Sequence, residues 1–115
     1  DIPIVQKLRE AYRTWLGLLP RLPRLARYTL GVKIDTLFTD TLELALLAGY
    51  TSRTQKLTAT QRASTKLDAL KFFLQLAWET NTIGTRAFGS LAEMLTEVGK
   101  MLGGWQRALE KQQTE

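Results

Sequence analysis

The chain has 115 residues, of which 44% are hydrophobic and 23% are charged, and its formal net charge is +5 at pH 7. This length and composition indicate one globular domain over residues 1–115, with a core that needs no disulfides. Cysteine and histidine are both absent, which excludes thiolate chemistry, the commonest general base and the usual zinc ligands. The absence of cysteine indicates a cytoplasmic protein. No uninterrupted apolar run is long enough to span a bilayer, and no membrane partner is expected.

The first amphipathic segment predicts a helix over residues 2–19. Its apolar side chains recur at steps of three and four, which places them on one stripe of a helix. These residues are Val5, Leu8, Tyr12, Trp15 and Leu19. Pro20 and Pro23 follow. Because each proline lacks a backbone N–H and restricts the residue before it, we expect the helix to end here.

The second segment predicts one continuous helix over residues 25–48. Its apolar stripe consists of Leu30, Ile34, Leu37, Phe38, Leu42 and Ala45. The last two turns are apolar nearly all round apart from Glu43, so we expect them to be buried on several sides.

The third predicted helix covers residues 52–80. Its inward stripe consists of Ala63, Leu67, Leu70, Leu74 and Ala77. Asn81 follows, and asparagine tolerates the left-handed backbone conformation that ends many helices. Trp78 lies beside the end of the stripe and is the tryptophan that we expect to be exposed. Trp15 and Trp105 fall on apolar stripes and are expected in the core.

The fourth predicted helix, over residues 85–112, has the most regular stripe. It consists of Phe88, Leu91, Leu95, Val98, Leu102, Trp105 and Leu109. No segment of the chain alternates apolar and polar residues with the period of a half-buried strand. Four helices with short connections predict an all-α fold, an up-down-up-down four-helix bundle.

Nine of the sixteen basic residues lie in two stretches that contain no acidic residue, between Glu10 and Asp35 and between Glu43 and Asp68. They are Arg13, Arg21, Arg24, Arg27 and Lys33 in the first stretch, and Arg53, Lys56, Arg62 and Lys66 in the second. Positive charge that is kept apart from acids attracts polyanions and steers their approach. These nine residues are therefore the candidate nucleic-acid contacts.

Three of the nine, Arg21, Arg24 and Arg27, surround the predicted junction of the first two helices. Arginine at a helix N-terminus does not complement the helix dipole, so helix stability does not explain these residues. They bind either an external phosphate, which we favour, or an acidic residue of the fourth helix or of another subunit. In an up-down bundle this junction and the start of the third helix lie at opposite ends, so one basic track would require an oligomer. No spacing matches a base-reading motif, which favours contacts to the nucleic-acid backbone.

Gly99 and Gly103 lie inside the fourth predicted helix, where each glycine costs about 1 kcal/mol relative to alanine. Spaced four apart, they share one ridge and would let another backbone approach closely. We favour close helix packing within the chain over a contact between subunits. Trp105 lies on the neighbouring apolar stripe, and we expect it to take part in the same close packing.

No metal, cofactor or catalytic residue is predicted. Asp40 and Glu43, three residues apart on one helix, are the nearest pair that could hold a magnesium ion through oxygen ligands. A solvated acidic edge with salt bridges explains this pair better. A chain with no histidine, cysteine or clustered carboxylates does not indicate an enzyme.

Two motifs resemble a known family. Residues 27–31, Arg-Tyr-Thr-Leu-Gly, resemble its Arg-(Phe/Tyr)-Thr-Leu-Gly opening of the second helix. Residues 97–105, Glu-Val-Gly-Lys-Met-Leu-Gly-Gly-Trp, resemble its Glu-(Ile/Val)-Gly-(Arg/Lys)-Met-Leu-Gly-Gly-Trp ending. The family is that of the Avd-like four-helix-bundle proteins, the accessory variability determinants of diversity-generating retroelements. Bundle proteins encoded in intervening sequences of large-subunit ribosomal RNA genes are near relatives.

The resemblance implies a homopentameric, barrel-like assembly whose basic surface binds the reverse transcriptase and the template RNA, in support of error-prone cDNA synthesis. Arg27, Gly99, Gly103 and Trp105 fall in the matched motifs. Val32 departs from the pattern, since a polar residue is expected after Gly31. The match does not separate the retroelement branch from the ribosomal-RNA branch.

The sequence thus predicts a non-enzymatic accessory protein that binds RNA and a reverse transcriptase as a homo-oligomer. DNA or an RNA–DNA hybrid is an alternative nucleic acid. A second hypothesis is a protein-only scaffold, or a ribosomal-RNA-type bundle protein, whose basic faces bind an acidic partner. A metal-dependent nuclease that uses Asp40 or Glu43 is the weakest alternative.

Overall fold

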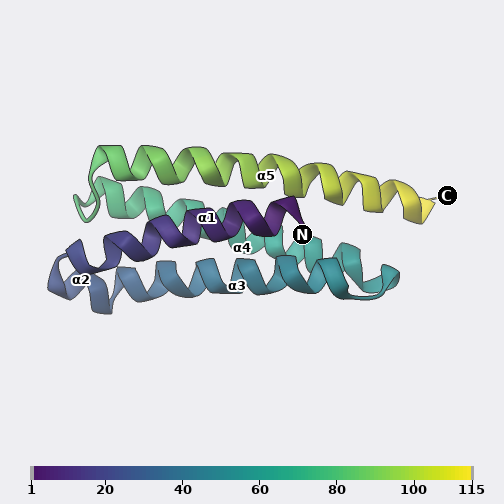
Figure 1. The fold of residues 1–115 in the computed structure, drawn as a ribbon, viewed down its shortest axis with the longest axis horizontal. Helices are drawn as coiled ribbons and strands as arrows, with labels where there is room; N and C mark the ends of the chain where they lie inside the picture. Colours follow the sequence, from purple (N-terminus) through teal and green to yellow (C-terminus); the bar gives the residue numbers. More distant parts are fainter. Residues whose placement is uncertain (1, 115) are drawn as a thin grey trace.

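The computed structural model of the chain describes residues 2–114, which form helices and turns without a strand. Four helices are long: α1 (Pro3–Leu18), α3 (Leu30–Tyr50), α4 (Arg53–Glu79) and α5 (Thr85–Thr114). A 3-10 turn, η1 (Leu19–Arg21), and a short helix, α2 (Arg24–Tyr28), connect α1 to α3. The long helices run alternately up and down along one axis (Figure 1), which confirms the predicted all-α bundle.

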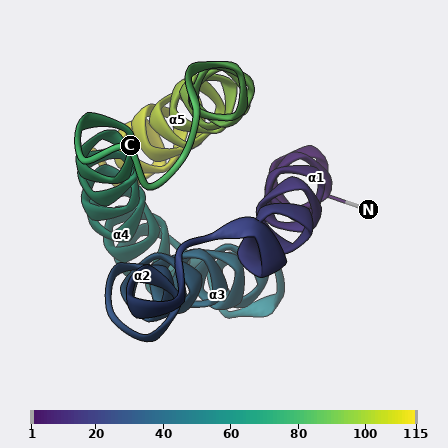
Figure 2. The ribbon, with the colours of Figure 1, turned by 90° about the vertical axis from the view of Figure 1, so that its left-hand side faces the viewer.

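The bundle is elongated, with extents of 51 × 22 × 21 Å. Viewed from one end, α1, α3, α4 and α5 follow one another around a common core (Figure 2). Trp15 and Phe38 are fully buried and their rings stack with centroids 6.1 Å apart. The predicted apolar stripes supply most of the remaining core, including Leu8, Leu70 and Leu102. No helix within residues 2–114 is long and apolar enough to cross a membrane.

The helix expected over residues 25–48 is instead two helices, because the chain breaks at Thr29. This residue has φ −119° and ψ −91°, outside the helical region. The break brings Gly31 against the preceding turn, where a β-carbon would lie 3.0 Å from the carbonyl oxygen of Ala26. Leu22 enters the core just before α2, whereas α2 itself buries none of its residues. The apolar period continues past the break, so the sequence pattern did not reveal it.

The turn between α4 and α5 follows the sequence prediction. Asn81 has a φ of 61°, the left-handed conformation expected there. The backbone N–H of Thr82 donates to the carbonyl of Ala77 at 2.8 Å, which satisfies one of the last carbonyls of α4. This turn brings the first residues of α5 back beside the end of α4 (Figure 1).

The two ends of the bundle are therefore built from different elements. At one end, on the left in Figure 1, η1 and α2 lie near the α4–α5 turn. We call this end the junction pole and define it as residues 19–28 and 78–88. The α3–α4 turn lies at the opposite end. The predicted separation of the first helix junction from the start of α4 is thus confirmed.

Candidate nucleic-acid interface

Four arginines are exposed at the junction pole: Arg21 in η1, Arg24 and Arg27 in α2, and Arg86 in the first turn of α5. The local fold explains their exposure. The prolines end α1, and the five residues of α2 are too few to bury an apolar face once Leu22 has entered the core. The arginines of α2 therefore extend into solvent rather than across the bundle.

Arg21 and Arg86 come from distant parts of the sequence and line the same groove. It has a volume of about 490 Å³ and lies between the end of α1 and the start of α5. Its apolar lining includes Leu18, Leu22 and Ile83. The groove thus extends from the η1 segment to the α4–α5 turn and is lined by two arginines.

No carboxylate within residues 2–114 forms an ion pair with any of these four arginines. Residues 11–34 and 80–92 contain no acidic residue at all. The nearest acid in sequence to the turn, Glu79, accepts a hydrogen bond from Gln75 Nε2 at 3.1 Å. The junction pole therefore contains four arginines and one acid, Glu79, which forms no ion pair with them. This excess of positive charge attracts polyanions.

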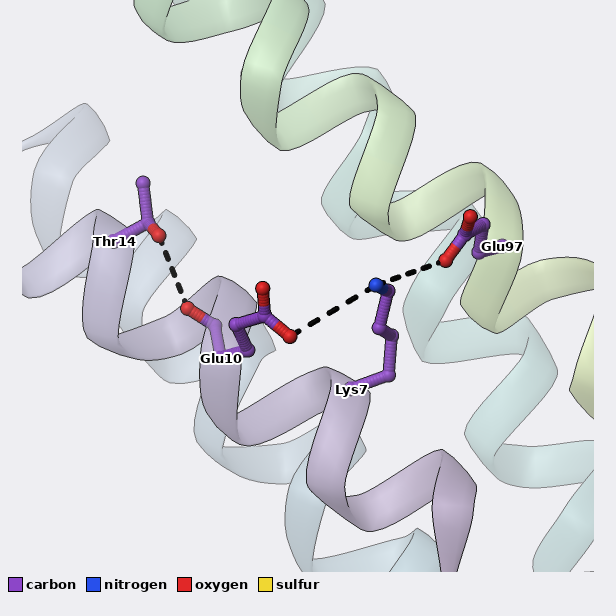
Figure 3. Close-up of polar contacts among 4 residues, drawn as sticks. All are labelled: Lys7, Glu10, Thr14 and Glu97. Atoms are coloured by element: carbon purple, nitrogen blue, oxygen red, sulfur yellow. Dashed lines mark hydrogen bonds and ion pairs between the residues drawn. The ribbon is translucent and has the colours of Figure 1, made fainter.

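The acids of α1 and α5 lie farther along the bundle. Figure 3 shows Lys7 of α1 reaching toward α5, with its Nζ 3.0 Å from Oε2 of Glu97 and 3.8 Å from Oε2 of Glu10. The hydrogen bond to Glu97, followed by the negative charge of Glu10, raises the pKa of Lys7. With Glu93, these residues line a second hollow of about 330 Å³. This acidic hollow adjoins the groove of Arg21 and Arg86, since Thr14 and Ser90 line both, but its acids form no ion pair with the arginines.

The second acid-free stretch does not form one surface. Arg53 is exposed at the first position of α4, at the opposite end from the junction pole. The Nζ of Lys56 donates to the carbonyls of Ala48 at 2.9 Å and Gly49 at 3.2 Å. These are among the last carbonyls of α3, which have no partner within the helix and carry partial negative charge. Lys56 therefore has a structural role.

Arg62 and Lys66 line a groove of about 500 Å³ between α3 and α4 together with two acids, Asp40 and Glu43. The Nζ of Lys66 lies 3.3 Å from Oδ2 of Asp40. This pairing is the salt-bridged acidic edge that the sequence favoured over a magnesium site. No group of three potential metal ligands occurs in the described part of the chain.

The remaining two candidates lie outside the junction pole. Lys33 is exposed on α3, and its Nζ is 5.6 Å from the ring centroid of Phe73 on α4. A lysine at this distance interacts with the ring face. Arg13 is exposed on α1. The structure therefore separates the nine predicted residues into an arginine cluster at one pole, a mixed-charge groove, and positions scattered over the bundle.

The glycines of α5 have different surroundings. A β-carbon on Gly99 would lie 2.9 Å from Nζ of Lys71 and 3.7 Å from Cδ2 of Leu67, so this glycine faces side chains of α4. A β-carbon on Gly103 would meet only Arg107 of its own helix. Trp105 is half-buried and packs against the core. The close approach of another backbone, expected at both glycines, stays a prediction, because the nearest neighbours at each are side-chain atoms.

Arg86 is the residue of the junction pole that sequence reasoning did not select. It is the only basic residue in the acid-free segment 80–92, so it belongs to no cluster along the sequence. The signal that could have found it is topological. Because α4 and α5 are antiparallel neighbours, a residue just after their turn lies at the same end as the junction of the first two helices.

The comparison with known proteins gives one family. The chain matches the bAvd-like family over residues 2–109, which includes both motifs and every helix from α1 to most of α5. No curated protein matches the chain.

Proposed function

Because the chain belongs to the bAvd-like family, we propose that it is a non-catalytic protein that binds template RNA and the reverse transcriptase of a diversity-generating retroelement. Membership supports, at the family level, an accessory protein of such an element. The proposed role is to support mutagenic cDNA synthesis in the cytoplasm. The proposal includes RNA binding, the reverse transcriptase as the partner, and a homopentameric state.

The observation that carries the proposal is the cluster of exposed arginines at the junction pole. Arg21, Arg24, Arg27 and Arg86 have no acidic partner within residues 2–114. Guanidinium groups match the geometry of phosphate oxygens and stay charged at any physiological pH. An RNA backbone is a polyanion that such a cluster would bind without reading the base sequence.

The mechanism is electrostatic. Arginines of the junction pole would hold successive phosphates and present the template strand to the polymerase, which performs the chemistry. One pole supplies few contacts, and the other candidate residues lie elsewhere on the bundle. Copies of the chain arranged around one axis would place several such poles next to each other, which would lengthen the basic track and increase affinity through multivalency.

The test is fluorescence anisotropy of a labelled structured RNA titrated with the purified protein across a salt series. We expect the logarithm of the affinity to fall linearly with the logarithm of salt concentration. A slope of about −0.9 for each duplex phosphate, or about −0.7 for each single-stranded phosphate, would count the contacts. Absence of binding even at low salt would refute RNA binding by this protein.

A second candidate function, a protein-only scaffold, is favoured by exposed apolar residues beside the same arginines. On α2, Leu25 is 82% exposed and Tyr28 is 72% exposed, and Val32 at the start of α3 is 53% exposed. Apolar side chains surrounded by basic ones fit an acidic protein surface. Co-purification of the reverse transcriptase after nuclease treatment, together with no RNA binding, would favour the scaffold. Loss of the complex after nuclease treatment would favour RNA.

A further inference from the structure

Trp78 is an exposed tryptophan whose ring is held in a fixed position. It lies at the end of α4 and is 37% exposed. Its ring stacks on that of Phe88 in α5, with centroids 5.0 Å apart and planes inclined by 8°. Its indole Nε1 donates to the hydroxyl oxygen of Thr85 at 3.2 Å. The ring is therefore packed on one side and bonded at its edge, while part of its surface remains open to solvent.

The other two tryptophans have different surroundings. Trp15 is completely buried and Trp105 packs against the core. Packing in the apolar core explains the positions of Trp15 and Trp105. It does not explain Trp78, whose indole is partly exposed to water. A preorganised ring loses little conformational entropy when a flat ligand stacks on it. Trp78 thus has the physical properties of a stacking platform.

The position of the ring relates it to the arginines. Thr85, which bonds the indole, is followed directly by Arg86, and Phe88 lies in the same first turn of α5. Arg86 shares its groove with Arg21. One helical turn therefore carries both the support of the aromatic ring and an arginine that forms no ion pair within residues 2–114. Aromatic rings next to cations are the combination with which proteins bind single-stranded nucleic acid.

We propose that Trp78 stacks an unpaired base of a single-stranded RNA segment whose phosphates are held by the arginines of the junction pole. This inference rests on the proposed function and adds to it the class of nucleic acid that this end of the molecule binds. Bases in a duplex already stack on one another, so their faces are not available to the ring. Every base has such a face, so the platform favours unpaired over paired RNA without selecting a sequence.

The experiment compares Trp78→Leu with the wild-type protein by anisotropy, using labelled oligouridylate of about 12 nucleotides and a duplex RNA. We expect the affinity for oligouridylate to fall by about 5- to 150-fold, the effect of removing one base–aromatic stack. The salt slope and the affinity for the duplex should stay unchanged, because no charge is removed. Trp78→Phe should keep most of the affinity, since a phenyl ring also stacks.

Tyr50→Leu is the matched control, because Tyr50 is 77% exposed and lies at the end of α3, at the opposite end of the bundle. It should bind oligouridylate as the wild type does. Circular dichroism should show equal helicity for all variants. Should Trp78→Leu fold poorly, quenching of tryptophan fluorescence by oligouridylate provides the test, present in the wild type and absent in Trp78→Phe.

The outcomes separate this inference from the proposed function. Wild-type affinity in Trp78→Leu, together with weakened binding in an Arg21→Gln, Arg86→Gln variant, would overturn the stacking platform while RNA binding remained. Equal losses for the duplex and the oligouridylate, or for Tyr50→Leu, would also overturn it, as would the absence of quenching in the wild type. If the wild type bound neither RNA, both proposals would fail.

Discussion

The phenolic hydroxyl of Tyr12 on α1 donates a 2.9 Å hydrogen bond to Oδ1 of Asp35 on α3. The same oxygen accepts a second hydrogen bond, of 3.2 Å, from the indole Nε1 of Trp15. Asp35 is the first acid after the arginine-rich junction in the sequence. Its carboxylate holds α1 to α3 through two neutral donors, and it forms no ion pair with the arginines of the junction pole. Asp35 thus stabilises the contact between α1 and α3 without pairing with the exposed arginines.

Replacing Tyr12 with phenylalanine should destabilise the protein by about 1 kcal/mol, because one donor to Asp35 is lost. It should also change the response to alkaline pH. Burial first, and then the hydrogen bond to Asp35, raise the pKa of Tyr12 above 10.0. Since the folded-state pKa exceeds the unfolded one, this contribution is complete below about pH 10 and is lost as the pH rises through the folded pKa.

Urea unfolding between about pH 8 and pH 11 measures this effect. The wild type should lose stability over this range more steeply than Tyr12→Phe. Tyr28→Phe is the control, because Tyr28 is exposed on α2 and should keep the wild-type slope. Parallel pH profiles for the wild type and Tyr12→Phe would contradict the prediction.

Two glycine substitutions should have opposite effects on stability. Gly31→Ala should destabilise by about 1–3 kcal/mol, because its β-carbon would lie 3.0 Å from the backbone oxygen of Ala26, which cannot move aside without a shift of α2. Gly89→Ala should stabilise by about 1 kcal/mol, since nothing lies within 4 Å of its β-carbon and alanine favours the helix. Thermal unfolding compares both variants, and a stabilised Gly31→Ala would show that the break at Thr29 does not require glycine.

Neutralising two arginines of α2 should change the salt dependence of RNA binding. In an Arg24→Gln, Arg27→Gln variant, the slope of log affinity against log salt should become shallower by about 0.7 for each single-stranded phosphate contact that is lost. Lys66→Gln is the control, because Lys66 is already paired with Asp40. An anisotropy salt series in which Lys66→Gln changes the slope as much as the double variant would place the phosphate contacts in the α3–α4 groove instead.

Reversing the charge of Arg21, Arg24 and Arg27 to glutamate should abolish RNA binding and leave the helicity intact. All three side chains are exposed and none forms an ion pair within residues 2–114, so the fold does not depend on their charge. Circular dichroism measures helicity and anisotropy measures binding. An unchanged affinity would exclude the junction pole as the RNA site.

Much of the bundle was predictable from the sequence because amphipathic periodicity is a local property. The stripe from Phe88 to Leu109 lies on the buried side of α5, and the exposure of Trp78 and the left-handed conformation of Asn81 also agree with expectation. A residue's phase on a helix decides which side faces the core, whatever its neighbours are. The sequence by itself therefore determined the four long helices, most of their buried faces and the acid-free stretches. The expected burial of the last turns of α3 on several sides was wrong, because Leu46 and Leu47 are 40% and 47% exposed.

Only the tertiary structure decided which distant side chains meet. It placed Arg86 and Arg21 along one groove and paired Lys66 with Asp40. It brought the hydroxyl of Thr85 within hydrogen-bond distance of the indole Nε1 of Trp78. It also broke the expected second helix at Thr29, where α2 passes close to Gly31. These relations depend on turn geometry and on the register between antiparallel helices. Neither is encoded in the spacing of residues along one helix, because a shift of one turn would keep every apolar stripe buried and change every charged neighbour.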